Sequence, residues 1–218
     1  MLNTILFDFD GTITDTGEGI LKSVQYTLRT FGIPADDLEK LRCFVGPPPV
    51  DTFQYEFGMG PGEAAAAQRV FRREYRKNGV MQNTLYPGMA AMLHRLRGAG
   101  KTLAIATSKP TELAVLILDS YGLTELFHLI EGSPLDGHRT TKIQVMEAAL
   151  QELNLTEKEK AETVMVGDRC FDIEGANHFG LKSIGVRYGY AKPGELEAAG
   201  ATWCADTVRE LEALLMAD

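Results

Sequence analysis

TILFDFDGT, residues 4–12, joins a run of apolar residues to two aspartates and a glycine. The apolar run is typical of a buried strand, and Gly11 follows it as a turn. Positions i and i+2 of a strand point to the same side, so Asp8 and Asp10 are predicted to share one small space. Their like charges repel there, which is costly unless a cation or a proton offsets them. The stretch therefore predicts a strand end that holds a metal ion and a nucleophile.

The length and composition are those of an ordinary globular protein. The chain has 218 residues, of which 44% are apolar and 24% are charged, with a formal net charge of −8 and a sequence pI of about 5.1. This length suits one α/β domain, or a core domain with a small insert. An acidic chain without a Lys/Arg cluster is a poor candidate for nucleic-acid binding, so we expect no nucleic-acid partner.

The cysteines and the start of the chain bear on the compartment in which the protein works. Cys43, Cys170 and Cys204 are odd in number and far apart, which argues against a disulfide framework or a zinc site and fits a reducing compartment. The chain enters its first strand soon after Met1 and has no apolar run of membrane-spanning length. We therefore expect no signal peptide and no membrane span, and a cytoplasmic protein that is a monomer or a homodimer.

Helical and strand patterns divide the chain into two parts. Residues 16–85 carry helical spacing without a strand pattern, and they are too many for a single crossover connection, so they are predicted to form a helical insert. The predicted strands after the insert are residues 102–106, 127–130, 163–166, 182–186 and an edge strand at 202–204. Helices alternate with these strands, and a capping box at 207–210 is predicted to open the last helix. The alternation predicts an α/β fold with a parallel sheet covered on both faces, built from residues 1–15 and 86–218.

Polar residues that directly follow the strands are the candidates for a site. Ligands of open α/β sheets bind beyond the carboxyl ends of the strands. Thr107 and Ser108 follow the second strand of the core, and Asp168 and Asp172 follow the fourth. Carboxylates are ligands of the kind that Mg²⁺ prefers, and a strand-end hydroxyl suits a phosphoryl oxygen. Each residue alone could simply cap the following turn or helix, but the aspartates taken together favour a metal site.

Lys142 indicates a phosphate site. Thr141 and Gln144 form a capping-box pattern, which places Lys142 at the first position of a helix. A cation there opposes the helix macrodipole, whereas an ammonium and helix N–H groups together suit an anion. The alternative is an exposed lysine in solvent, and beside the aspartates we favour phosphate. Lys109, by contrast, is predicted to be a surface cation.

With these residues assembled, the chain resembles the haloacid dehalogenase superfamily, on its phosphatase side. Four motifs match in order along the chain: DFDGT at 8–12, Thr107, Lys142, and Gly167-Asp168 with Asp172. The resemblance implies a Rossmann-like core and identifies the insert at 16–85 as the small helical cap of this superfamily. Dehalogenases resemble the chain but lack an aspartate at the position of Asp10. In having this aspartate, the chain is similar to phosphatases and phosphomutases.

Three shorter matches resemble the phosphoglycolate phosphatase-like group, which includes bacterial 5′-nucleotidase-type members. They are FVGPP at 44–48, LDG at 135–137 and GDR at 167–169. The resemblance implies a phosphatase for a small phosphorylated metabolite, either phosphoglycolate or a nucleoside 5′-monophosphate. Two alternatives stay open, namely a phosphomutase of β-phosphoglucomutase type with the same aspartates, and a noncatalytic binding module on the same fold.

The resemblance also implies roles for the aspartates of the first and fourth motifs. Asp8 is expected to be the nucleophile that forms an aspartyl-phosphate, and Asp10 the acid and base of the reaction. The Asp8 carboxylate, the Asp10 backbone carbonyl and Asp168 are expected to hold Mg²⁺, the predicted cofactor. The metal would bring the anionic nucleophile and the anionic phosphoryl group together.

The remaining matched residues are expected to hold the substrate. Thr107, Ser108 and Lys142 would bind the phosphate, and Asp172 would orient Lys142 or a metal-bound water. The cap would close over the phosphate, exclude water and select the leaving group. Its expected specificity elements are the first cap helix near Glu18 and the loop at 43–49, which contains Gly46 and Pro47.

Overall fold

The computed structural model describes residues 2–134 and 141–217 and divides into two compact units. Unit 1 comprises Met1–Thr14 and Leu85–Asp218, and unit 2 comprises Asp15–Thr84, so each boundary lies one residue from the expected position. Two short strands, β2 (Thr14–Asp15) and β3 (Thr84–Leu85), pair where the chain passes between the units. The sequence pattern does not predict β3, because two residues are too few to show the alternation of a strand.

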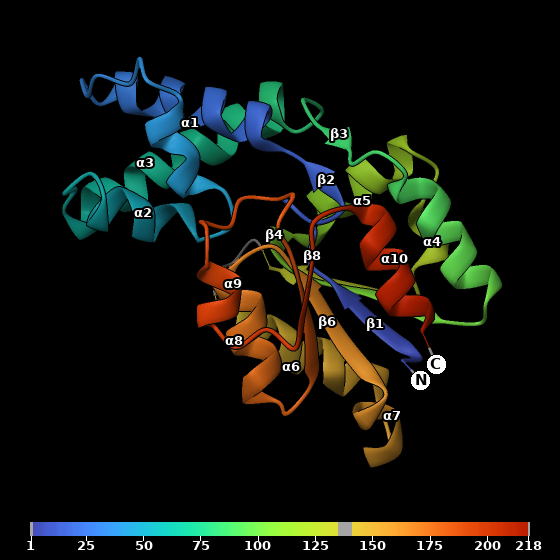
Figure 1. The fold of residues 1–218 in the computed structure, drawn as a ribbon. Helices are drawn as coiled ribbons and strands as arrows, with labels where there is room; N and C mark the ends of the chain where they lie inside the picture. Colours follow the sequence, from blue (N-terminus) through green and yellow to red (C-terminus); the bar gives the residue numbers. More distant parts are fainter. Residues whose placement is uncertain (1, 135–140, 218) are drawn as a thin grey trace. The chain divides into compact units, whose positions relative to one another are not determined.

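Unit 1 is built on a six-stranded parallel sheet with the strand order β5-β4-β1-β6-β7-β8 (Figure 1). Its strands are β1 (Thr4–Phe7), β4 (Thr102–Pro110), β5 (Leu129–Ser133), β6 (Thr163–Gly167), β7 (Lys182–Val186) and β8 (Trp203–Ala205). Because β1 pairs with β4 on one side and β6 on the other, the residues after β1 lie at the middle of the carboxyl edge. The predicted α/β fold with a parallel sheet is confirmed.

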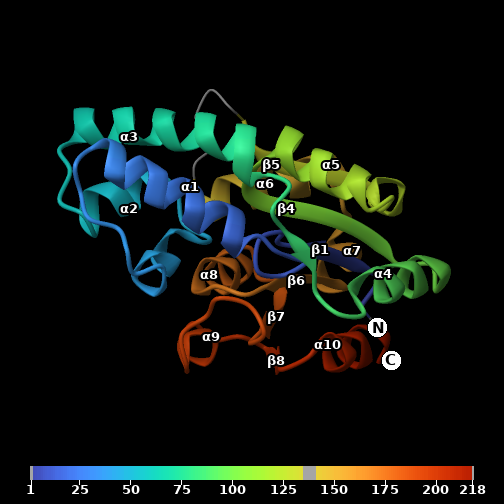
Figure 2. The ribbon, with the colours of Figure 1, turned by 90° about the horizontal axis from the view of Figure 1, so that it is seen from above.

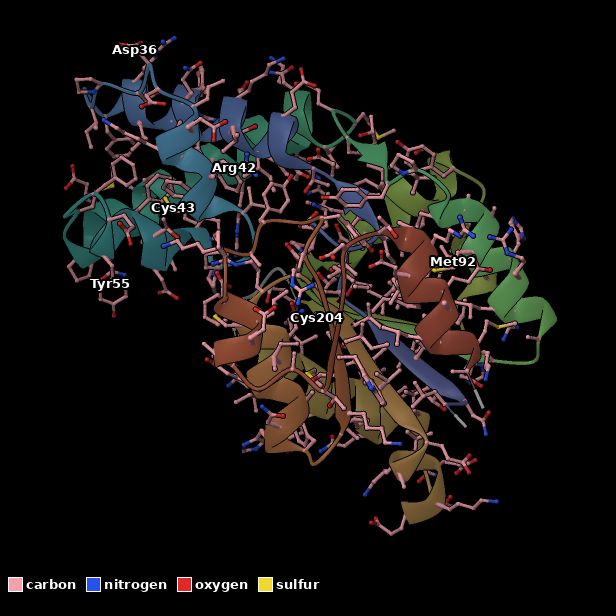
Figure 3. The ribbon with its side chains drawn as sticks, in the orientation of Figure 1. Asp36, Arg42, Cys43, Tyr55, Met92 and Cys204 are labelled. Carbon is pink, nitrogen blue, oxygen red and sulfur yellow. The ribbon has the colours of Figure 1, made fainter. Side chains whose placement is uncertain are left out.

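Helices cover both faces of this sheet. The helical segments of unit 1 are α4 (Met89–Gly98), α5 (Thr111–Ser120), η3 (Thr124–Leu126), α6 (Lys142–Leu153), α7 (Glu157–Ala161), α8 (Cys170–His178), α9 (Glu195–Ala198) and α10 (Val208–Met216). Leu6 packs into a buried cluster with residues of α6 and α8. Its neighbour Phe7 points to the opposite face and meets the Phe127 ring edge-on at 6.5 Å. Met92, fully buried on α4, lies beside α10 (Figure 3).

Two local features of unit 1 differ from the sequence-based expectation. The second strand runs to Pro110, four residues beyond its predicted end, because β4 continues past an irregularity to pair with β5. The predicted capping box at the start of α10 is incomplete. Thr207 accepts from the Glu210 N–H as an N-cap, but the Glu210 carboxylate accepts from the N–H of Asp206, one residue too early.

Unit 2 is helical. It contains α1 (Gly17–Thr30), the 3₁₀ helix η1 (Glu39–Phe44), α2 (Pro49–Tyr55), α3 (Pro61–Glu74) and a π-helical turn η2 (Tyr75–Gly79). Helices α1 and α3 run side by side (Figure 2). The Phe44 ring packs at a tilt against those of Phe53 and Phe57, which joins η1 to α2 and to the residues just after it. Tyr55, at the end of α2, points away from the unit and is 84% exposed (Figure 3).

The π-helical turn fits closely against α1. Gly19 and Gly79 approach so closely that a Cβ at Gly19 would lie 2.1 Å from the Gly79 carbonyl oxygen. Within α1, the Ser23 hydroxyl donates to the Gly19 carbonyl at 2.7 Å. In the described part of the chain, no helix combines the length and the apolar character needed to cross a membrane.

We expect Gly19→Ala to destabilise the protein. The added methyl overlaps a backbone oxygen that cannot rotate away, and overpacking of this kind costs about 1–3 kcal/mol. Gly62→Ala is the matched control, because Gly62 also lies in a helix of unit 2 and a Cβ there meets nothing within 4 Å. Alanine is the better helix former, so this control is expected to be neutral or slightly stabilising. Thermal and urea unfolding measure both, and equal stability of the two variants would contradict the close approach.

Candidate active site

The carboxyl edge of the sheet gathers side chains from three neighbouring strands. Asp8 follows β1, Asp168 follows β6, and Thr107 lies in β4. All three side chains are buried, with Asp168 fully so. The three strands are hydrogen-bonded neighbours in parallel register, which is why residues so far apart in sequence meet.

Three buried carboxylates form the centre of the site. One oxygen from each of Asp8, Asp168 and Asp172 can be chosen so that all three lie within 4.8 Å of one another. Burial, together with the charges of Asp172 and Asp8, raises the pKa of Asp168 well above its usual range. Burial likewise raises the pKa of Asp172 to about 6, although Lys142 opposes the shift. When ionised, the three carboxylates face the one ammonium of Lys142, and a bound cation would offset their remaining repulsion.

Lys142 provides the positive charge inside this cluster. Its ammonium lies 2.8 Å from Asp8 Oδ1 and 2.7 Å from Asp172 Oδ1, and it donates to the Ala106 carbonyl at 2.9 Å. Burial lowers the pKa of Lys142, but the carboxylates of Asp172 and Asp8 outweigh burial and raise it overall. The predicted capping box of Thr141 opens α6 and places Lys142 at its first position. The alternative of a lysine in solvent is wrong, because Lys142 is buried.

Asp172 combines two of the expectations made for it. Its Oδ2 accepts the N–H of Arg169, so the carboxylate caps the start of α8. Its Oδ1 lies 2.7 Å from the Lys142 ammonium, while its orienting role stays a prediction. The residue is completely buried, and a Cβ at Gly167 would lie 2.1 Å from the carboxyl carbon of Asp172. The end of β6 therefore needs glycine to admit this carboxylate.

Residues of the loop after β7 contact Asp168 and its neighbour Thr12. The sequence motifs did not indicate this loop. The N–H of Tyr190 donates to Asp168 Oδ2 at 2.8 Å, and the Thr12 hydroxyl donates to Oδ1 at 3.3 Å. Tyr188 donates its hydroxyl to the Thr12 carbonyl at 3.0 Å, and burial raises the pKa of this phenol, which keeps it a neutral donor. The strand-end rule itself pointed here, since Tyr188 comes two residues after a predicted strand.

Two glycines admit the Asp168 carboxylate. A Cβ at Gly11 would lie 2.2 Å from Asp168 Oδ2, and Gly11 also has a φ of +83°, which few other residues adopt. A Cβ at Gly189 would lie 2.4 Å from both the Asp168 Cβ and the Gly11 carbonyl oxygen. No side chain fits at either position without moving the carboxylate, so the orientation of Asp168 is set by backbone on two sides.

The group of three close carboxylates does not include that of Asp10. The Asp10 carboxylate pairs with Lys109, whose ammonium lies 2.9 Å from Oδ1. β1 ends at Phe7 and the chain turns at Gly11, so both aspartates of the motif follow the strand. The prediction of Lys109 as a surface cation is wrong, since its side chain is only 3% exposed. The irregularity in β4 directs it inward.

The other predicted site residues are more dispersed. Ser108 is half-buried next to Thr107, whose hydroxyl accepts the backbone N–H of Lys109 at 3.2 Å. Glu18 lies on α1 in unit 2, exposed and paired with Lys22. Gly46, with a φ of +106°, and Pro47 lie between η1 and α2 of the same unit. The sequence match at 135–137 lies outside the described residues.

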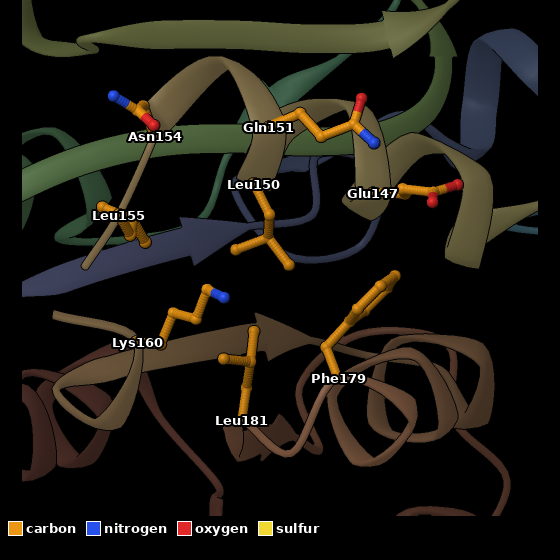
Figure 4. Close-up of a pocket in the computed structure, with 8 residues that line it drawn as sticks. All are labelled: Glu147, Leu150, Gln151, Asn154, Leu155, Lys160, Phe179 and Leu181. Carbon is orange, nitrogen blue, oxygen red and sulfur yellow. The ribbon is translucent and has the colours of Figure 1, made fainter. Parts of the chain in front are cut away.

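A groove of about 440 Å³ opens at the opposite edge of the sheet, near the start of β7 (Figure 4). It is lined by Glu147, Leu150, Gln151, Asn154, Leu155, Lys160, Phe179 and Leu181. Leucine and phenylalanine side chains form its apolar part, and its Lys160 is paired with Glu157. None of the strand-end carboxylates lines it, so this groove is separate from the candidate active site.

Relatives of known activity resemble the chain over nearly its whole length. The chain matches the family described as haloacid dehalogenase-like hydrolase over residues 5–186. It is 39% identical over 203 residues to a 5′-nucleotidase of Pseudomonas aeruginosa, which covers 93% of this chain and 90% of that protein. It is 32% identical over 216 residues to a phosphoglycolate phosphatase (plasmid) of Cupriavidus necator, with coverage of 97% and 92%.

Another relative carries a different name. The tyrosine-protein kinase PtkA of Mycobacterium tuberculosis is 36% identical over 200 residues, which cover 91% of this chain and 66% of that protein. Among solved structures, a predicted phosphatase from Clostridium acetobutylicum superposes with a TM-score of 0.94 at 39% identity, over 99% of both chains. On the motifs, the fold and these relatives, the chain belongs to the haloacid dehalogenase-like hydrolases, as a phosphatase that acts on phosphoric monoesters.

Proposed function

We propose that this phosphatase hydrolyses a small-molecule phosphomonoester through a covalent aspartyl-phosphate on Asp8, with Mg²⁺ as cofactor. One observation carries the proposal: a buried carboxylate at the end of the central strand faces a buried ammonium and two further carboxylates. An anion that enters such a site meets Lys142 and a cation held by the aspartates, while Asp8 lies within the same group. This combination suits nucleophilic attack on phosphorus.

The donor set fits a divalent cation. Asp8, Asp168 and Asp172 gather three carboxylates, while Lys142 is the ammonium paired with two of them. Carboxylate oxygens are hard ligands of the kind that Mg²⁺ takes. We propose Asp8, Asp168 and the backbone carbonyl of Asp10 as its ligands. When bound, the ion supplies positive charge that brings the anionic nucleophile and phosphoryl group together and stabilises the transition state.

In the proposed reaction an Asp8 oxygen bonds to phosphorus as the bond from phosphorus to the leaving oxygen breaks. Asp10 gives its proton to that leaving oxygen. Asp10 then takes a proton from a water whose oxygen attacks phosphorus, which releases inorganic phosphate and restores the Asp8 carboxylate. Lys142 and Thr107 hold the non-bridging oxygens, with Ser108 as a further donor, and Asp172 orients Lys142.

We propose that unit 2 is a cap that selects the leaving group, with Glu18, Gly46 and Pro47 as its specificity elements. The loop after η1 supports this, because a glycine with positive φ is followed by Pro47, Pro48 and Pro49, each of which fixes its own φ. The relatives named 5′-nucleotidase and phosphoglycolate phosphatase support a small phosphorylated metabolite as substrate. A cytoplasmic monomer or homodimer remains our prediction, and no disulfide forms among the described residues.

Asp8→Asn is expected to abolish turnover without unfolding the protein, since asparagine keeps the shape of the side chain but is a poor nucleophile. Release of inorganic phosphate from p-nitrophenyl phosphate, phosphoglycolate and nucleoside 5′-monophosphates, with and without Mg²⁺, measures the effect. Asp206→Asn is the control, because Asp206 is exposed and pairs with Arg187 away from the cluster. Near wild-type Mg²⁺-dependent hydrolysis by Asp8→Asn would show that the nucleophile is another group.

The same assays separate the proposed phosphatase from its alternatives. Stoichiometric or greater release of inorganic phosphate marks a phosphatase, whereas a persistent aspartyl-phosphate with a bisphosphate intermediate marks a phosphomutase. Transfer of phosphate to a tyrosine side chain would mark the activity for which PtkA is named. A chain that binds phosphorylated metabolites but transfers no phosphate would be a binding module.

Gly189→Ala is expected to weaken Mg²⁺ binding by about 10-fold or more, because displaced supports of a metal ligand typically cost that much. The added Cβ would lie 2.4 Å from the Asp168 Cβ and must push this residue aside. Isothermal titration of Mg²⁺ in the absence of substrate measures the affinity directly. Gly98→Ala in unit 1, where a Cβ meets nothing within 4 Å, is expected to bind Mg²⁺ as the wild type does. Unchanged affinity in Gly189→Ala would count against Asp168 as a ligand.

A further inference from the structure

We propose that Lys109 is the positioning residue for Asp10, which it holds by both carboxylate oxygens in the orientation for proton transfer. This inference rests on the proposed function, in which Asp10 serves the leaving group. It assigns a task to a buried lysine that neither the motifs nor the proposed mechanism uses. It also means that the two aspartates of the first motif are served by two different lysines.

The contacts of Lys109 with Asp10 are those of a two-point attachment. The ammonium lies 2.9 Å from Oδ1 and donates to Oδ2 at 3.2 Å as well. The side chain of Lys109 is 3% exposed and that of Asp10 is 14% exposed, so water weakens the pair little. The ammonium also lies 5.8 Å from the centre of the Phe9 ring. A carboxylate held through both oxygens loses its freedom to rotate, which is what a proton donor with a fixed target requires.

The backbone of β4 is built to turn Lys109 inward. The pairing of β4 with β5 shifts its register between Thr107 and Pro110, and the Thr107 hydroxyl accepts the N–H of Lys109 within this irregularity. On the neighbouring strand, a Cβ at Gly132 would lie 2.4 Å from the carbonyl oxygen of Lys109 and 2.7 Å from the N of Thr111. Glycine on β5 therefore makes room for the irregular backbone that aims this lysine. Irregularities of this kind commonly redirect a side chain next to an active site.

Among the contacts described above, Lys109 and Lys142 pair with different aspartates. Lys142 faces Asp8 and Asp172 and donates to the Ala106 carbonyl, whereas Lys109 faces Asp10. Loss of Lys109 therefore leaves the ammonium of the carboxylate cluster in place. The predicted defect is confined to the step that Asp10 serves, and this separation makes the proposal testable by the choice of leaving group.

The test compares phenyl phosphate with p-nitrophenyl phosphate, which are close in size but differ in how much the leaving oxygen needs a proton. The measured quantity is kcat/KM, which ends at the first irreversible step and so reports transfer to Asp8. Lys109→Met should lower kcat/KM for phenyl phosphate by up to about 10²-fold, the cost of a misplaced catalytic group. It should lower the value for p-nitrophenyl phosphate much less. Lys109→Arg, which keeps a positive donor, should recover part of the loss.

A double-mutant cycle shows whether Lys109 acts through Asp10. Asp10→Asn alone should show the same preference for the better leaving group, with a loss of about 10²–10⁴-fold on phenyl phosphate. In the Asp10→Asn background, adding Lys109→Met should then cost little more, because the group that it positions is already gone. A merely structural role of Lys109 would instead add its full cost in both backgrounds.

Lys101→Met is the matched control. Lys101 precedes the same strand, is buried to the same extent, and donates its ammonium to the Leu2 carbonyl at 2.6 Å, far from the catalytic aspartates in the sheet. Its loss should lower thermal stability without changing the ratio of kcat/KM between the two substrates. Gly132→Ala is the second variant for the case in which Lys109→Met does not fold, and it should shift that ratio in the same direction.

Two results would overturn the proposal. One is an equal loss on both substrates in folded Lys109→Met, or in Gly132→Ala where Lys109→Met does not fold. The other is a full additional loss from Lys109→Met when Asp10 is already Asn. Either result leaves the proposed function standing if Asp10→Asn itself prefers the better leaving group. An Asp10→Asn variant without that preference would contradict the proposed role of Asp10, and with it the role of Lys109.

Discussion

The confinement of three buried carboxylates in one small space is the constraint on which the rest of the structure depends. Burial, together with repulsion from Asp172 and Asp8, raises the pKa of Asp168. Such a group is unfavourable in isolation and persists only where the surrounding fold fixes it. The central position of β1, the capping box that places Lys142, and the glycines beside Asp168 all serve to hold this one cluster.

The two aspartates of the first motif are close in sequence but have different partners. Asp8 is part of the carboxylate cluster and pairs with Lys142, whereas Asp10 pairs with Lys109. These separate partners hold the two carboxylates in different places, Asp8 within the cluster and Asp10 against β4. The proposed mechanism uses this separation, because Asp8 attacks phosphorus while Asp10 serves the leaving oxygen.

The sequence predicts the parts of this arrangement that depend on local pattern. The apolar run before Asp8, the strand-end positions of Thr107 and Asp168, and the helix start at Lys142 are all properties of short segments. The inward direction of the Lys109 side chain could not be predicted from the sequence. It depends on a register shift in β4 and on Gly132, a residue of the neighbouring strand. A side-chain direction that is set by a partner strand leaves no periodic signal in the segment that carries it.

The relatives bear on where substrate choice arises in such a protein. Proteins named 5′-nucleotidase and phosphoglycolate phosphatase are 39% and 32% identical to this chain. Their names specify different leaving groups attached to the same kind of phosphate. The phosphoryl group is common to such substrates, so residues that act on it need not change. In the proposed reaction the leaving oxygen receives its proton from Asp10, which places the variable part of the substrate on the Asp10 side of the phosphate. In this mechanism the Lys109–Asp10 pair lies next to the leaving group, which varies among substrates. The carboxylate cluster and Lys142 act on the phosphoryl group, which does not vary.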